Sequence, residues 1–230
     1  MSSPILPLVK MKEANYPANY KLTNLSKKGL INYLMRKPHI YIGKKYKSFN
    51  GNVIEFGCGD GNNINYFKSY NTYTFSDYTF NRFNEKNLQK QNTYKVQFDL
   101  INDSYDKVRN KYDLFLLFHT LEHIISPHEC LENLYNSLKP GGTIELIQPN
   151  DPGFAWNLGE WFGSYKSNID KKTFYYHNAR EHVNSIKNLD RLIKYYFENL
   201  TIKYYPPQFN ILNLELFRIY TIKKPKPNLN

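Results

Sequence analysis

The residues of this chain best placed for chemistry are three glycines in the segment 53–61, V-I-E-F-G-C-G-D-G. Gly57, Gly59 and Gly61 follow a short apolar run with the composition of a buried strand. Glycine readily adopts positive φ and lets a ligand come close to the backbone. A helix after the loop would add unpaired N–H groups and a positive dipole end. The pattern predicts a loop that holds a nucleotide-like ligand, although a tight structural turn would use the same residues.

Two carboxylates extend this pattern, because ligands of open α/β sheets bind at the carboxyl ends of the strands. Asp77 ends the second expected strand, where it could accept hydrogen bonds from both hydroxyls of a ribose. Asp99 ends the third, where it could accept one from an adenine amino group. The glycine spacing G-x-G-x-G differs from the dinucleotide fingerprint G-x-G-x-x-G. The set therefore favours a single adenosine, and a nicotinamide-dependent dehydrogenase stays an alternative at the level of the fold.

Strands and helices are expected to alternate around these residues. Apolar runs predict strands at 53–56, 72–76, 94–98, 112–118, 143–148, 200–205 and 215–223. Apolar residues at helical spacing predict helices at 22–35, 62–69, 81–90, 126–138 and 185–200. Alternation with nearly continuous apolar strands predicts a mostly parallel sheet covered on both faces.

Two helix boundaries have local signals. Pro38 is expected to end the first helix, because the residue before a proline avoids helical geometry. Ser126, Pro127 and Glu129 predict a defined start for the helix 126–138. Serine would cap it, proline suits its first position, and glutamate three residues after the serine would complete a capping box.

These pieces together resemble the class I S-adenosylmethionine-dependent methyltransferases of the small-molecule type. The resemblance covers residues 52–149, where E-F-G-C-G-D-G, S-D, F-D, Y-D-L-F-L-L-F-H-T-L-E-H and L-K-P-G-G occur in the family's order and spacing. It implies an α/β, Rossmann-like three-layer sandwich whose seven-stranded sheet is mostly parallel, with an antiparallel last strand. The residues outside this range add an N-terminal helical segment and a lid insertion after the fifth strand to the expected fold.

The resemblance implies S-adenosyl-L-methionine as cofactor and assigns roles to the strand ends. The glycines would pack under the methionine part while Glu55 orders their loop, and Asp77 would hold the ribose. The side chains after the third and fourth strands would frame the adenine and line the sulfonium. The implied cofactor-binding residues are Glu55, Gly57, Cys58, Gly59, Gly61, Asp77, Asp99, Leu100, Phe118 and His119. Cys58 is interpreted as a small packing residue rather than a reactive thiol.

The methyl acceptor is expected to contact the segment 151–184, which is long for a connection and contains both tryptophans. The segment is interpreted as a lid with an apolar wall and a polar end, with an aromatic mini-core as the alternative. The candidate acceptor-binding residues are Trp156, Trp161, Tyr176 and Arg180, the last as a bidentate partner for an anion. His119 and His182 are candidates for a general base, because imidazole titrates near neutral pH. His123 is interpreted as a structural hydrogen-bonding residue.

The net charge of +11 lies at the ends of the chain. Residues 1–50 carry +9 and residues 201–230 carry +4, whereas residues 51–200 carry −2. This fits either a lysine-rich composition or a patch attracted to an anionic partner. The two cysteines form neither a disulfide framework nor a metal site, and no metal is expected. The sequence shows no transmembrane run and no secretory signal, so a cytoplasmic location is expected.

Three functions follow from these observations. The first is methyl transfer to an oxygen or nitrogen of a small molecule, such as a sugar or another metabolite, by a domain at 51–230 behind a basic segment at 1–50. The second is methylation of tRNA or another macromolecule through that basic segment. Its charge is mostly lysine without interleaved stacking residues, which disfavours nucleic acid as a partner. The third is an inactive, cofactor-binding partner subunit.

Overall fold

The computed structural model describes residues 30–154, 156, 157, 179, 182–206 and 214–226. The chain divides into two compact units, 1–37 and 38–230. The first helix, α1 (Leu30–Lys45), crosses this division, and the rest of the described structure belongs to the second unit.

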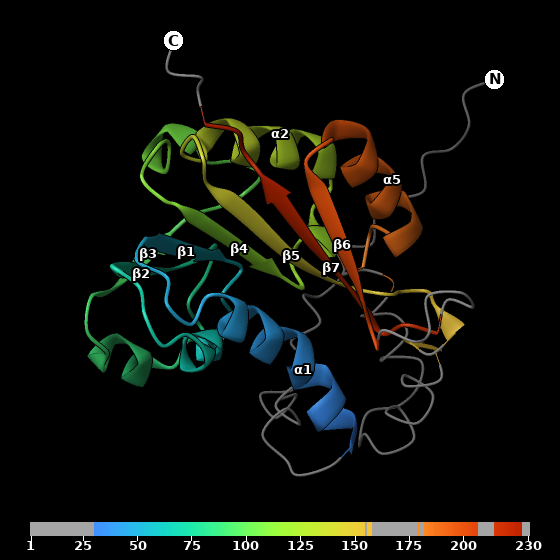
Figure 1. Cartoon of the computed structure of the whole chain (residues 1–230), viewed down its shortest axis with the longest axis horizontal. Coiled ribbons are helices and arrows are strands. Elements are labelled where there is room, and N and C mark those ends of the chain that lie inside the picture. Colours follow the sequence, from blue (N-terminus) through green and yellow to red (C-terminus); the bar gives the residue numbers. More distant parts are fainter. Residues whose placement is uncertain (1–29, 155, 158–178, 180–181, 207–213, 227–230) are drawn as a thin grey trace, which may run out of the picture. The chain divides into compact units, whose positions relative to one another are not determined.

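The second unit is built on one seven-stranded sheet in the order β3-β2-β1-β4-β5-β7-β6 (Figure 1). Strands β1 to β5 run parallel, and β7 is antiparallel to both of its neighbours. This confirms the predicted mostly parallel sheet with an antiparallel last strand. The strands are β1 (Asn52–Phe56), β2 (Thr72–Asp77), β3 (Thr93–Gln97), β4 (Leu114–Phe118), β5 (Thr143–Pro149), β6 (Leu200–Tyr205) and β7 (Phe217–Lys223).

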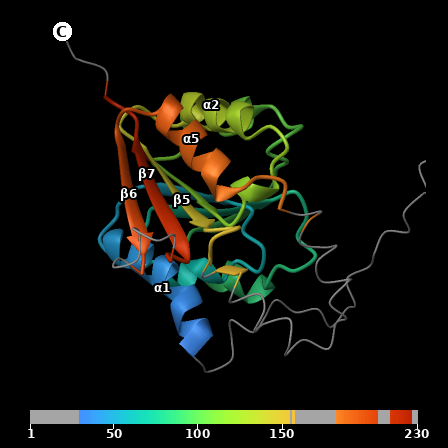
Figure 2. The ribbon, with the colours of Figure 1, turned by 90° about the vertical axis from the view of Figure 1, so that its right-hand side faces the viewer.

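Helices cover both faces of the sheet, which confirms the three-layer arrangement. Helices α2 (Pro127–Ser137) and α5 (Ile186–Tyr196) lie together on one face (Figure 2). Their apolar residues form the main core with alternate residues of β1, β4 and β5. The other face of β5 presents Glu145, which the last residue of α1 and the residue after it contact. The central strand β4 is buried at all five positions, as expected for a strand covered on both sides.

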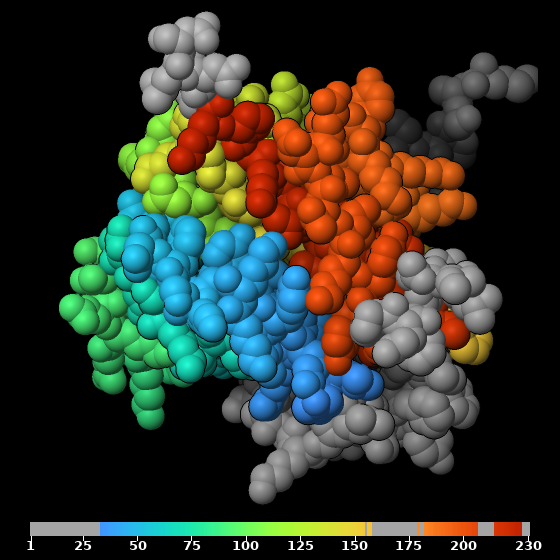
Figure 3. Space-filling view, viewed as in Figure 1, coloured from blue at the N-terminus to red at the C-terminus, as the bar shows by residue number. Residues whose placement is uncertain are grey.

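The part of α1 after Pro38 anchors the opposite layer. Lys45 Nζ and Tyr46 OH both donate to Glu145 Oε1 at 2.6 Å, and Thr221 Oγ1 donates to Glu145 Oε2 at 2.9 Å. Beside β6, Lys203 Nζ lies 3.9 Å from the centre of the Tyr41 ring, where the surfaces of α1 and β6 meet (Figure 3). The contacts of Tyr41, Lys45 and Tyr46 thus join the chain just after Pro38 to β5, β7 and the edge strand β6.

The prediction that Pro38 ends the first helix was wrong, because α1 continues through it to Lys45. Proline removes one backbone hydrogen bond and usually kinks or ends a helix. Here the following turns bury Ile42 completely and reach the Glu145 contacts, which stabilise the helix beyond the proline. Of the expected helix 22–35, residues 22–29 lie outside the described part of the chain.

Two expected helices, 62–69 and 81–90, are short 3₁₀ turns instead: η2 (Asn62–Tyr66) and η3 (Glu85–Gln89). Asparagine side chains explain the difference, because they bond to nearby backbone groups and so compete with the helix. Asn65 Nδ2 donates to the carbonyl of Asn62 at 3.0 Å, and the Asn84 side chain accepts from the N–H of Lys86 at 3.3 Å. The glycine loop is therefore followed by one 3₁₀ turn and not by a helix with a strong dipole.

The other elements match their predicted positions within a few residues. The two ends of the α2 capping box are not joined: Ser126 makes no side-chain capping bond, so that prediction was wrong, whereas Pro127 does occupy the first turn. Helix α5 is capped by Ser185, whose hydroxyl accepts from the N–H of Asn188 at 3.3 Å. Among the described residues, no helix has the length and apolar composition needed to span a bilayer.

Candidate active site

The glycine loop connects β1 to η2 at the carboxyl edge of the sheet. Gly57, Gly59 and Gly61 have φ values of 66°, 54° and 71°. The N–H of Cys58 donates to the carbonyl of Ser76 at 3.0 Å, which ties the loop to β2. Burial raises the pKa of the Cys58 thiol, so the thiol stays protonated, in agreement with a packing role.

The three glycines differ in what surrounds them. A Cβ on Gly57 would lie 2.5 Å from Thr120 Oγ1, and a Cβ on Gly61 would lie 2.5 Å from Cε2 of Phe83. Among the described residues, no atom beyond the two adjacent residues lies within 4 Å of a Cβ placed on Gly59. Packing thus requires the outer two glycines, whereas the middle one borders open space where a ligand can approach the backbone.

Asp77, at the end of β2, lies against this middle glycine. Its Oδ2 accepts from the N–H of Gly59 at 2.9 Å, and its Oδ1 accepts from the N–H of Thr79 at 3.3 Å. The residue is 9% exposed. A carboxylate has about four acceptor positions, so capacity for hydroxyl groups remains. The structure therefore brings together the two residue types that the sequence singled out, the loop glycines and the carboxylate after the second strand.

Glu55 lies behind the loop and is buried. Its Oε1 accepts from Asn63 Nδ2 at 2.5 Å and its Oε2 accepts from Tyr73 OH at 2.7 Å. Burial raises the pKa of the Glu55 carboxyl to about 7, and these hydrogen bonds oppose that rise. Glu55 thus joins β1 to η2 and β2, and its side chain bonds to the segment after the loop through Asn63.

Asp99 and Leu100 lie after β3. Asp99 is half-buried, with its Oδ1 accepting from the N–H of Ile101 and its Oδ2 accepting from Asn102 Nδ2, both at 2.8 Å. The Asn102 bond, followed by the Ile101 bond, holds the pKa of Asp99 below its usual value. Leu100 is buried, and its carbonyl accepts from Tyr105 OH at 2.8 Å. Both oxygens of Asp99 thus already accept hydrogen bonds from the following turn, so only their remaining lone pairs could accept from an adenine amino group.

The end of β4 carries a histidine that contacts another in α1. His119 has a φ of 55°, which is uncommon for a residue other than glycine, and its Nε2 lies 3.3 Å from Nε2 of His39. The ring of His39 meets the edge of Phe118 at a centroid distance of 5.3 Å. His39 was not among the predicted site residues, because the first helix was expected to end at Pro38.

Burial lowers the pKa of His39 to about 4 and that of His119 well below 6.5. Both rings are therefore neutral at pH 7, and one can donate to the other. The expectation that His119 titrates near neutral pH used the pKa of a solvated imidazole, and burial shifts the pKa of His119 below that value.

His182, the other base candidate, lies beside the same strand end. Its Nδ1 is 2.5 Å from Asp151 Oδ2, and its ring centroid is 5.1 Å from that of His123. The nearby His39, His123 and His182 add to the effect of burial in lowering the pKa of His119. The structure therefore gathers these histidines in one region at the ends of β4 and β5.

The candidate acceptor-binding residues are described only in part. Trp156 is half-buried, and its ring lies edge-on to Phe217 at a centroid distance of 6.0 Å. Trp161, Tyr176 and Arg180 lie outside the described residues, as does most of the expected lid at 151–184.

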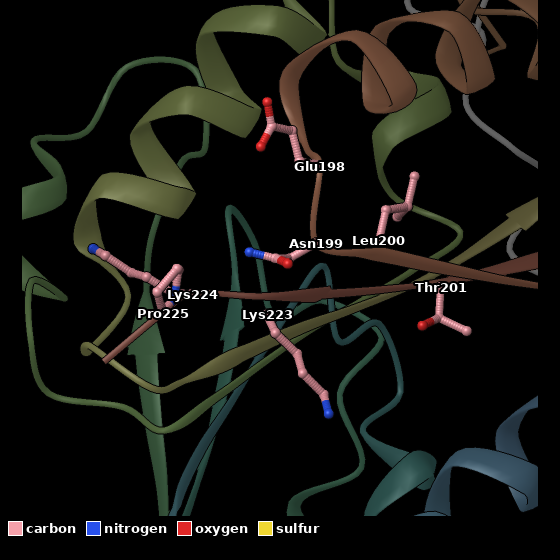
Figure 4. Close-up of a pocket in the computed structure, with 7 residues that line it drawn as sticks. All are labelled: Glu198, Asn199, Leu200, Thr201, Lys223, Lys224 and Pro225. Carbon is pink, nitrogen blue, oxygen red and sulfur yellow. The ribbon is translucent and has the colours of Figure 1, made fainter. Parts of the chain in front are cut away.

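An open pocket of about 510 Å³ lies elsewhere, between the start of β6 and the end of β7 (Figure 4). Lys223 in its lining pairs with Thr143, the first residue of β5, so the pocket is at the amino edge of the parallel strands. Lys224 Nζ donates there to the carbonyls of Tyr135 and Leu138, both at 2.8 Å, and so closes the end of α2. The pocket is thus separate from the glycine loop, which lies at the carboxyl edge.

Comparison with solved structures finds the same fold in many proteins. Phosphoethanolamine N-methyltransferase 2 of Haemonchus contortus, solved with S-adenosyl-L-methionine, is 12% identical with a TM-score of 0.56 over 82% of this chain. The chain spans about half of that protein, 52%. N-methyltransferase NodS from Bradyrhizobium japonicum, solved with S-adenosyl-L-homocysteine, is 15% identical with a TM-score of 0.60, covering 91% of this chain and 94% of NodS. The methyltransferase domain of bacterial CtHen1-C is 15% identical with a TM-score of 0.61, covering 84% and 99%.

At these low identities the structural similarity shows only the fold, and the family is shown by a match to a family model. No curated protein matches the sequence. A family model described as a methyltransferase domain matches residues 29–195, which is most of the chain. The match confirms the resemblance seen in the sequence. The chain therefore belongs to the methyltransferase-domain family and has the Rossmann-like fold of the class I S-adenosylmethionine-dependent methyltransferases.

Proposed function

We propose that this chain transfers the methyl group of S-adenosyl-L-methionine to an oxygen or nitrogen of a small-molecule acceptor, such as a sugar or another metabolite. The observation that carries the proposal is the 2.9 Å hydrogen bond between Gly59 and Asp77 beside open space. It supports the proposal because a carboxylate able to accept from ribose hydroxyls lies beside accessible backbone, at the edge where such sheets bind ligands.

In this proposal the methionine part of the donor lies over the glycine loop and its ribose hydroxyls donate to Asp77. Leu100 and Asp99 border the adenine, and Phe118 and His119 border the sulfonium. Methyl transfer is an in-line displacement, so the protein mainly aligns the acceptor with the methyl carbon and excludes water. The carbon–sulfur bond breaks with its electron pair left on sulfur, and S-adenosylhomocysteine leaves as a neutral thioether.

The acceptor enters, in this proposal, from the side of the histidines at the ends of β4 and β5. His182, oriented by Asp151, can take the proton of the acceptor, because a carboxylate on Nδ1 raises the basicity of the other ring nitrogen. The similar protein of Haemonchus contortus is named for a small acceptor, phosphoethanolamine, which supports an acceptor of this size class. The lid at 151–184, the domain limits 1–50 and 51–230, and a cytoplasmic location belong to the same proposal.

The test is an activity screen of the full chain with methyl-labelled S-adenosylmethionine. Fractions of small metabolites and purified RNA are offered separately as acceptors. We expect labelled small-molecule product, and we expect Asp77→Ala to abolish labelling while Asp106→Ala, a substitution of an exposed carboxylate, leaves it intact. Label in RNA alone would assign the activity to a macromolecule and refute the small-molecule acceptor.

A further inference from the structure

Three potential metal ligands converge beside the proposed methyl-transfer site. Glu122, His123 and His182 each place one ligand atom within 4.8 Å of the other two. The first two form the end of η5 (Leu121–His123), directly after β4, and the third precedes α5. The group runs from buried Glu122 to exposed His123, so it is reachable from the surface.

Glu122 gives the independent observation that something is missing from this cluster. The residue is 2% exposed, and its Oε2 has no hydrogen-bond partner within the described part of the chain. Its Oε1 lies 3.9 Å from Nδ1 of His119. A buried carboxylate oxygen without a partner is costly, and a bound cation would remove that cost.

Hydrogen bonds around the cluster already orient its ligands. Asp151 Oδ2 lies 2.5 Å from His182 Nδ1, so a proton on Nδ1 leaves Nε2 as the ligand nitrogen. Metal-binding histidines commonly use this arrangement, in which a carboxylate fixes the tautomer and the ring orientation. The N–H of Asn184 donates to the carbonyl of Glu122 at 3.1 Å, and its Nδ2 donates to the carbonyl of Ile124 at 2.5 Å. These bonds hold the two ligand segments together without an ion.

We propose that Glu122, His123 and His182 bind one divalent metal ion and leave a coordination position open for an oxygen of the methyl acceptor. Two imidazoles with one carboxylate suit zinc and other first-row transition metals better than magnesium, which prefers oxygen ligands alone. The expectation of no metal came from the cysteines, and this set uses none.

This inference rests on the proposed methyl transfer and narrows its acceptor to a hydroxyl group. A divalent ion lowers the pKa of an oxygen bound to it, so the acceptor can lose its proton near neutral pH. Because Nε2 of His182 is then a metal ligand and not the base, the oxygen–hydrogen bond breaks with its proton passing to solvent water at the exposed His123 end of the cluster. The oxygen lone pair then forms the bond to the methyl carbon as the carbon–sulfur pair moves to sulfur. The products are a methyl ether, S-adenosylhomocysteine and one proton.

The test is calorimetric titration of the chelator-treated full chain with Zn²⁺ and with Mn²⁺. We expect one bound ion per chain in the wild type and at least about a tenfold weaker affinity in Glu122→Gln and His182→Ala, the range seen for lost ligands and their partners. His128→Ala, which removes an exposed histidine of α2, is the matched control and should bind as the wild type does. The d–d absorption of the Co²⁺-loaded chain, with its loss in His123→Asn, gives a second readout in a variant close in size.

Two results would overturn the metal site: no stoichiometric binding by folded wild type, or equal affinity in wild type and both ligand variants. Circular dichroism spectra establish that each variant is folded. Titration of the same samples with S-adenosylhomocysteine separates the two proposals. Cofactor binding without metal binding would refute only the metal site, whereas metal binding without cofactor binding would refute the proposed methyl transfer.

Discussion

Replacing Gly59 with alanine should weaken cofactor binding much more than it weakens the fold. The residue has a φ of 54°, which disfavours alanine by roughly 1–2 kcal/mol. The added methyl group meets no atom of the described residues beyond its two neighbours within 4 Å, so no packing penalty follows from them. It does occupy the open space next to Asp77 where our proposal places the donor. We therefore expect the free energy of unfolding to fall by about 1 kcal/mol and the affinity for S-adenosylhomocysteine to fall at least about tenfold, or about 1.4 kcal/mol.

Gly57→Ala is the matched comparison in the same loop. Its φ of 66° carries a similar backbone cost, and its new Cβ would lie 2.5 Å from Thr120 Oγ1 and 2.8 Å from Thr120 Cγ2. Overpacking of this kind adds about 1–3 kcal/mol, so Gly57→Ala should lose clearly more stability than Gly59→Ala.

Urea unfolding of both variants and calorimetric titration with S-adenosylhomocysteine measure the two effects. Wild-type affinity in folded Gly59→Ala would refute the reasoning, because the ligand would then not use the space beside the middle glycine. Equal unfolding midpoints for the two variants would refute the assignment of packing to the outer one.

Other substitutions probe the carboxylates. Asp77→Asn should weaken S-adenosylhomocysteine binding at least about tenfold in calorimetry, because the amide offers one acceptor oxygen in place of two. Lys45→Met should lower the free energy of unfolding in urea by about 2 kcal/mol, because it leaves the buried Glu145 carboxylate without its cation. This loss is smaller than for a fully buried ion pair, because Lys45 is partly exposed. Lys47→Met, at an exposed position, should leave the urea midpoint unchanged. The pKa of Glu55, raised by burial to about 7, means that the folded chain keeps a proton that the unfolded chain loses near pH 4.5. This part of the stability is therefore complete below pH 4.5 and is lost as pH rises through 7, a fall of about 3 kcal/mol that urea titrations should show in wild type and lose in Glu55→Gln.

The sheet could be predicted from the sequence because its strands are coded locally. A run such as L-F-L-L-F at 114–118 is too short for a helix and too apolar for an exposed strand, so only a buried parallel strand fits. The antiparallel final strand came from the family resemblance, and the observed order of β7 between β5 and β6 confirms it. The same local coding placed Gly59 and Asp77 at neighbouring strand ends.

The helical elements were less predictable because tertiary contacts and side-chain hydrogen bonds decide them. Burial of Ile42 stabilises the turns of α1 that follow Pro38, a residue that alone would end the helix. The side chains of Asn65 in η2 and of Asn84 just before η3 bond to nearby backbone groups and so compete with longer helices, although the apolar spacing there is typical of a helix. Such competition depends on which backbone groups stay exposed, and the spacing of apolar residues does not reveal it.

Only part of the histidine region at the ends of β4 and β5 could be predicted from the sequence. The pair Glu122-His123 directly after a strand, with His182 far along the chain, was the available signal for a metal site. These three residues can form a site only if the chain brings His182 back to the end of β4, and no local sequence pattern predicts that tertiary contact. His39 was hidden in the same way, since its place opposite His119 depends on the course of α1.

A crystal structure of the full chain with S-adenosylhomocysteine would show directly whether the glycine loop and Asp77 form the donor site. We predict the ligand at the carboxyl edge of the sheet, with its ribose hydroxyls on Asp77, its amino-acid part over Gly59 and its sulfur facing the end of β4. Ligand bound in the pocket between β6 and β7, or placed with its ribose away from Asp77, would contradict this prediction.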